Sequence, residues 1–227
     1  MSEPIGGMYI MPRVKLIFLG LLAVLAVSAT ATSSAMAHEW LENGQPITST
    51  LQVLSSGGEF KLESSIVTLA CKSVHDIGTV GPGAADEATS IHFLECITNK
   101  ANCDVSSEGA PIGLILVTNI PTLLTLKETS LGVKVVADEF KENATRKNFV
   151  ELLFTSLVAK ACEPIPELAT IKGIISAEAK NIAGGEVELN FPKPELKGNT
   201  LNLAGVASKL FGKDTQMLTN GNLLSAI

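Results

Sequence analysis

The chain has 227 residues, of which 46% are hydrophobic, 18% charged and 4% aromatic. A hydrophobic share of this size excludes an intrinsically disordered protein and is sufficient for one sizeable domain. The formal net charge of −6 argues against a protein that binds nucleic acid through the phosphate backbone, because such proteins present a basic surface.

The segment 1–37 has the features of a secretory signal peptide. Arg13 and Lys15 precede an apolar run over residues 16–27, and small residues follow this run. The run is shorter than the roughly 20 residues that a transmembrane helix needs, so an uncleaved membrane anchor is the less favoured alternative. The sequence therefore predicts a protein that is secreted or held at the cell surface, with no membrane span once the leader is removed.

Two cleavage motifs of the form Ala-x-Ala follow the apolar run, at 29–31 and at 35–37. We favour the second, because the residues between them carry no structural pattern, and the mature chain then begins at His38. Residues 1–10 have the character of an extension upstream of a second start codon at Met11.

The expected mature part contains all four cysteines, and an even number in an exported chain indicates two disulfide bonds. Four cysteines allow three pairings. The short spacing between Cys96 and Cys103 suits a bridge across one loop, which would leave Cys71 paired with Cys162. A zinc site is a poorer alternative, because the chain has no C-x-x-C motif.

Hydrophobic and polar residues alternate over several short stretches, as is typical of strands with one buried and one solvated face. Such stretches lie at 60–63, 91–94, 133–137, 171–177 and 186–191. Glycine, proline and asparagine separate them at short intervals. The pattern predicts an all-β fold, an antiparallel β-sandwich or flattened barrel of about eight to eleven short strands, as a single domain over 38–213. Residues 214–227 lack the alternation and are expected to fray.

Several short motifs resemble a group of exported, β-rich proteins of soil actinobacteria. These motifs are Trp40 with Asn43-Gly44, the stretches 67–72 (VTLACK), 78–89 (GTVGPGAADEAT) and 93–96 (FLEC), Cys103, Cys162, the strand-like stretch 187–191 and residues 201–203. The resemblance spans most of residues 38–211. Because the group has no assigned activity, the resemblance implies export, β structure and disulfide bonds but no catalytic residue.

His38 is the sharpest candidate for chemistry. As the first residue of a mature chain, it would offer Cu(II) both its α-amino group and its imidazole. His75 or His92 opposite it would complete a site resembling that of the lytic polysaccharide monooxygenases. The residues that follow His38 do not resemble the start of those enzymes. A copper-binding protein or copper-dependent oxidase therefore stands as the alternative function, with copper as its cofactor.

The acidic residues suggest other chemistries, each less favoured than an ordinary surface role. His75-Asp76 has no accompanying nucleophile motif and is expected to be a polar pair on an edge strand. Asp86-Glu87 follows the glycine-rich turn at 81–83 and offers fewer oxygens than Ca²⁺ requires, so it is interpreted as an acidic loop tip. The pairs Asp138-Glu139 and Glu186/Glu188 are expected on solvated strand faces rather than in a glycosidase site.

Trp40, the only tryptophan, is interpreted first as a core anchor and second as a platform that binds sugar. Taken together, the residues favour a monomeric, non-catalytic binding or structural domain. Its partner is expected to be an extracellular ligand or a component of the cell envelope.

Overall fold

The computed structural model describes residues 38–191 and 196–227, so the expected signal peptide at 1–37 lies outside the described residues. Over these two ranges every regular element is a β-strand. Accordingly, they contain no helix of the length and apolar character that crossing a membrane requires.

Eighteen strands occur in the described residues. They are β1 (Trp40–Glu42), β2 (Gln45–Pro46), β3 (Leu51–Gly57), β4 (Phe60–Ser64), β5 (Thr68–Cys71), β6 (Ser73–Val80), β7 (Ala85–Leu94), β8 (Ile97–Thr98), β9 (Cys103–Ser107), β10 (Ile115–Glu128), β11 (Lys134–Lys141), β12 (Val150–Ser156), β13 (Leu168–Lys172), β14 (Ile174–Ile182), β15 (Glu186–Phe191), β16 (Asn202–Leu203), β17 (Val206–Leu218) and β18 (Leu224–Ala226).

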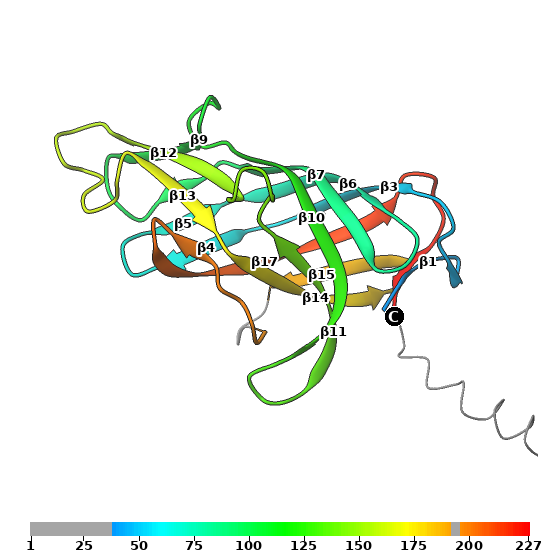
Figure 1. The fold of residues 1–227 in the computed structure, drawn as a ribbon. Helices are drawn as coiled ribbons and strands as arrows, with labels where there is room; N and C mark the ends of the chain where they lie inside the picture. The colour runs from blue at the N-terminus through cyan, green and yellow to red at the C-terminus, as the bar shows by residue number, and fades with distance from the viewer. Residues whose placement is uncertain (1–37, 192–195) are drawn as a thin grey trace, which may run out of the picture. The chain divides into compact units, whose positions relative to one another are not determined.

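Eight of these strands form a closed antiparallel barrel (Figure 1). Strands β3, β6, β7, β10, β11, β14, β15 and β17 follow one another around it in chain order, and β17 pairs with both β15 and β3 to close the ring. Closure of this kind leaves no barrel strand with an unpaired edge. The all-β prediction is confirmed, and the barrel rather than the sandwich describes these eight strands. The remaining short strands take the total above the expected eight to eleven.

The connections alternate between the two ends of the barrel, as an up-and-down order requires. At one end, termed the hairpin end, turns join β6 to β7, β10 to β11 and β14 to β15. At the other end the connections are longer and contain β4 and β5, β8 and β9, β12 and β13, and β16. These seven strands, termed the cap, pair with one another and with the first half of β17.

Gly212 marks the point at which β17 passes from the cap into the barrel. Phe211 is paired with β4 of the cap, and Gly212 is paired with β15 of the barrel. A Cβ atom at position 212 would lie 2.6 Å from the ring of Phe60. Glycine therefore allows this ring to pack directly against the backbone where cap and barrel meet.

Both ends of the described chain lie at the hairpin end. Strand β1 pairs with β18 and with β2 in a three-stranded sheet, and the backbone N–H of Trp40 donates to the carbonyl of Gly83 in the β6–β7 turn. Leu224 and Ala226 of β18 are buried. The expectation that residues 214–227 fray is therefore wrong: they form the end of β17 and all of β18. A strand of three residues is too short to show an alternating pattern.

Two disulfide bonds join Cys71 to Cys96 and Cys103 to Cys162. The prediction of two bonds is confirmed. The preferred pairing, Cys96 with Cys103 and Cys71 with Cys162, is wrong, although the spacing along the chain favoured it.

Strand pairing in the cap explains the observed bonds. Ala70 of β5 lies opposite Ile97 of β8 in an antiparallel register, so the next pair along is Cys71 and Cys96. Cys103 opens β9 and lies opposite Ser156 at the end of β12, and Cys162 follows in the loop after β12. Both bonds therefore follow from which strands are neighbours, and a local loop spacing does not contain that information.

Candidate ligand site in the barrel

An apolar cavity of about 110 Å³ lies where the barrel meets the cap. Seven barrel strands and four cap strands contribute to its wall. Its lining includes five phenylalanines, namely Phe60, Phe93, Phe140, Phe149 and Phe191. The volume is of the same order as the apolar cavity of about 150 Å³ that is known to take up benzene.

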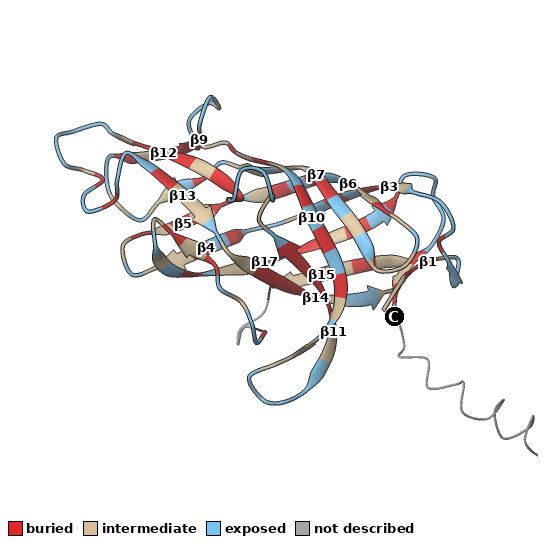
Figure 2. Cartoon of the chain, viewed as in Figure 1, coloured by how far each residue is buried: buried red, intermediate tan, exposed pale blue. Residues whose placement is uncertain are grey.

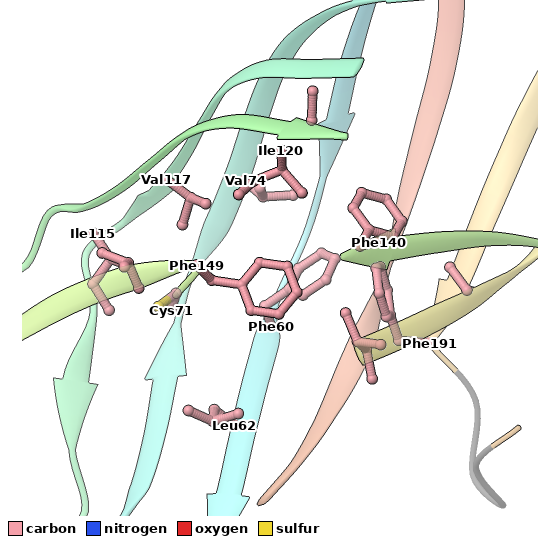
Figure 3. Packing of buried hydrophobic residues seen from close by; sticks show 14 of the residues in the cluster. Phe60, Leu62, Cys71, Val74, Ile115, Val117, Ile120, Phe140, Phe149 and Phe191 are labelled. Carbon is pink, nitrogen blue, oxygen red and sulfur yellow. The ribbon is translucent and has the colours of Figure 1, made fainter. Parts of the chain in front are cut away.

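The ring of Phe60 packs edge to face against two other phenylalanine rings. The ring centroid of Phe60 lies 5.5 Å from those of Phe93 and of Phe191, with interplanar angles of 70° and 68°. Such arrangements place the positive edge of one ring against the negative face of another. Figure 3 shows Phe60 in the middle of the cluster, with Phe191 on one side and Ile115 and Val117 on the other. The wall is thus held by contacts between strands of the cap and of the barrel.

A layer of polar side chains crosses the barrel between this cavity and the hairpin end. Six of the eight barrel strands contribute to it. Its members, termed the polar layer, are Ser55, Asp76, Asp86, Thr122, Asp138, Asp214 and Gln216. Asp138 is 0% exposed, and Asp76 and Asp214 are each 6% exposed. Along β3, β6 and β10, buried residues alternate with more exposed ones (Figure 2), as expected where side chains point alternately into and out of the barrel.

Several carboxyl oxygens of the polar layer lack hydrogen-bond partners. The hydroxyl of Ser55 donates to Oδ2 of Asp214 at 2.6 Å. Oδ1 of Asp76, Oδ1 of Asp214 and both carboxyl oxygens of Asp138 make no hydrogen bond with the described residues. Asp76 also lines a second cavity of about 10 Å³, together with Asp86 and Asp138. That volume suffices for about one water molecule.

The acids of the polar layer share a site without a cation, since the described lining of the two cavities contains no Lys, Arg or His. Burial, reinforced by the charge of Asp214, raises the pKa of Asp76 to about 7. Burial likewise raises the pKa of Asp86 to about 7. The pKa of Asp138 is raised further by complete burial and by the nearby Asp86 and Asp76, and burial raises the pKa of Asp214. Near neutral pH the layer therefore retains protons that exposed carboxyls would have lost.

The interpretation of these acids as surface residues is wrong. Asp76 lies on β6, which is paired on both sides by β3 and β7 and is not an edge strand. Asp86 belongs to β7 and lies past the turn rather than at its tip, and its Oδ1 is buried. Asp138 points into the barrel, while its neighbour Glu139 forms ion pairs with Lys127 and Lys141.

A signal for these positions is present in the sequence. Because side chains two residues apart on a strand point to the same face, Asp138 lies on the same face as Val136 and Phe140. Asp76 likewise lies on the same face as Val74 and Val80. The apolar neighbours at two-residue spacing mark the inward face. An acid in such a set is therefore a candidate for the interior.

Trp40 is 0% exposed at the hairpin end of the barrel. Its interpretation as a core anchor is confirmed. The alternative, in which its ring forms a platform for sugar, is wrong, because no face of the ring is exposed.

The three histidines do not come together at one place. His75 and His92 lie opposite each other on β6 and β7 and are exposed, and Nε2 of His92 lies 2.7 Å from the hydroxyl of Ser90. His38 lies beside the C-terminus, with its Nδ1 3.2 Å from the carbonyl oxygen of Ile227. Among the described residues no group of three His, Cys, Asp or Glu side chains is arranged to hold a metal ion. The copper hypothesis stays a prediction.

The barrel cavity and the polar layer beside it are therefore the features from which a function can be inferred. No family model, curated protein or solved structure shows a significant match to the chain.

Proposed function

We propose that the chain is an exported, monomeric, non-catalytic binding protein whose barrel holds a small, mainly apolar ligand. The observation that carries the proposal is the cavity of about 110 Å³ with its aromatic lining. An eight-stranded barrel has an interior wide enough either for its own side chains or for one small ligand. Pockets lined by apolar side chains with a few placed polar groups are the usual form of a small-molecule site.

The two disulfide bonds support the exported location. Disulfides persist in oxidising compartments and are rare where thiols are kept reduced, and both pairs of cysteines are bonded. For an exported protein we expect the ligand to be an extracellular compound or a small component of the cell envelope.

Toluene is a suitable first probe, because its single ring matches the size of the cavity. At a concentration about 100 times its dissociation constant, a ligand stabilises the folded state by about 2.7 kcal/mol. We expect the melting temperature to rise by roughly 5–10 °C for a domain of this size. The measurement is thermal unfolding followed by circular dichroism with increasing toluene.

A cavity-filling variant provides the matched control. Val117 lines the cavity and Leu123 is 38% exposed on the same strand, so we expect Val117→Phe to abolish the toluene shift and Leu123→Phe to retain it. The readout is the change on adding toluene, so a lower melting temperature of either free variant does not affect it. No shift in the unmodified chain, or an equal shift in Val117→Phe, would contradict the proposed function.

A further inference from the structure

We infer that the ligand carries a positively charged amino group, which Asp76 and Asp214 bind at the polar end of the cavity. The inference rests on the proposed function and extends it to a class of ligand: a small ammonium compound with one aromatic ring or a short alkyl body.

The geometry of the two acids supports a cationic group. Asp76 and Asp214 are the only residues with ionisable side chains among the described residues that line the cavity, and both are more than nine-tenths buried. Ser55 holds Oδ2 of Asp214, which leaves Oδ1 of Asp214 and Oδ1 of Asp76 without partners. Buried carboxyl oxygens are normally hydrogen-bonded. An ammonium group has three N–H donors and can therefore satisfy both oxygens at once.

The groups around these acids disfavour a neutral or anionic ligand. Asp76 is faced by Ser55 from β3, Asp86 from β7, Asp138 from β11 and Asp214 from β17. His75 acts to lower the pKa of Asp214, but its side chain is exposed on the outer face of β6 and does not line the cavity. The potential at the end of the cavity is therefore set by carboxyl groups. Where these acids are ionised they repel a carboxylate ligand, and an alcohol has one donor for two acceptors.

Binding of an ammonium group is coupled to proton release. Burial keeps Asp76 partly protonated near neutral pH, since its pKa is about 7, and an adjacent cation favours the ionised form. If one proton leaves on binding, affinity for the cation rises about tenfold between pH 6 and pH 8. Toluene has no charge, so its affinity is expected to change little over this range.

The experiment compares benzylamine with toluene by isothermal titration calorimetry at pH 6 and pH 8, using the whole mature chain. We expect benzylamine to bind at least tenfold more tightly than toluene at pH 8. Buffers of different ionisation enthalpy should show release of about one proton on binding at pH 6, where Asp76 is mostly protonated in the free chain, and much less at pH 8. Asp76→Asn and Asp214→Asn should each weaken benzylamine at least tenfold and leave toluene unchanged. Asp104→Asn, outside the cavity lining, should change neither affinity.

The outcomes separate this inference from the proposed function. If toluene binds while benzylamine binds no more tightly and releases no proton, the inference of a charged amino group is wrong, but the proposed apolar ligand site is still supported. If neither compound binds, both proposals fail. If an Asn variant loses toluene as well, its cavity is damaged, and the proton release of the unmodified chain then decides the question alone.

Discussion

Lowering the pH from 8 to 5 is expected to stabilise the folded chain. The carboxyls of Asp76 and Asp86 have pKa values of about 7 in the folded state because they are buried, against 3.8 when exposed in the unfolded chain. Between about pH 4 and pH 7 the folded chain therefore binds more protons than the unfolded chain, and stability falls as the pH rises through that window. As the pH rises from 5 to 8, one such carboxyl is expected to lower the free energy of unfolding by about 3 kcal/mol.

The measurement is the free energy of unfolding by urea at pH 5, 6, 7 and 8. Burial acts to raise the pKa of Glu139, but its ion pairs with Lys127 and Lys141 lower it on balance. Its stabilising contribution is lost only as the pH falls through the acidic range below 5, so it does not mask the effect. Stability that increases from pH 5 to pH 8 would show that the polar layer is ionised in the folded state.

Replacing Asp138, the most buried acid of the polar layer, tests directly whether buried carboxyls cause this pH dependence. Asp138→Asn removes a group whose pKa is raised by burial and by neighbouring carboxyls, so we expect higher stability at pH 8 and a weaker dependence on pH. Asp104→Asn serves as the control, because Asp104 lies on β9 of the cap and not in the polar layer. An equal pH dependence in both variants would contradict the assignment to the layer.

Removal of the Cys103–Cys162 bond is expected to lower the free energy of unfolding by about 4 kcal/mol. The bond closes a sequence separation of 59 residues, and in the chain-entropy model the stabilisation grows with the length of the closed loop. The Cys71–Cys96 bond closes 25 residues and is expected to contribute about 3.5 kcal/mol by the same relation. The variants are the double substitutions Cys103→Ser/Cys162→Ser and Cys71→Ser/Cys96→Ser, with unfolding measured in guanidinium chloride.

The connectivity can be checked independently of stability. Proteolysis of the non-reduced chain followed by mass spectrometry should yield one linked peptide pair containing Cys71 and Cys96 and another containing Cys103 and Cys162. A pair that joins Cys96 to Cys103 would contradict the strand register of the cap. Equal stability of both double variants and the unmodified chain would show that the bonds do not constrain the unfolded state.

Local alternation was enough to predict an all-β chain, because the inward and outward faces of each strand differ in polarity. The stretches 60–63 and 186–191 fall on β4 and β15 with alternating burial. The same alternation could not distinguish a sandwich from a barrel. Closure depends on the pairing of β17 with β15 and β3, and no property of a single strand encodes its neighbours.

The site was less accessible to sequence reasoning because its key residues break the usual relation between polarity and exposure. Asp76 and Asp138 occupy inward positions where an apolar residue is expected, and their burial depends on strands distant in sequence. The phenylalanines of the cavity come from both cap and barrel. These rings come into contact only because the long connections fold back over one end of the barrel. That arrangement depends on the topology of the whole domain, and no local sequence motif specifies it.

The pairing of β1 with β18 makes the order of synthesis relevant to folding. Trp40 lies opposite Ala226 in this pair, so one edge of β1 finds its partner only in residues 224–226, whereas the other edge pairs with the adjacent β2. Closure of the barrel likewise requires β17, which pairs with both β15 and β3. A nascent polypeptide that lacks β17 and β18 therefore has an open sheet with exposed edges, and contacts so far apart in sequence form slowly. The barrel can therefore close only after residues 206–218 have been synthesised.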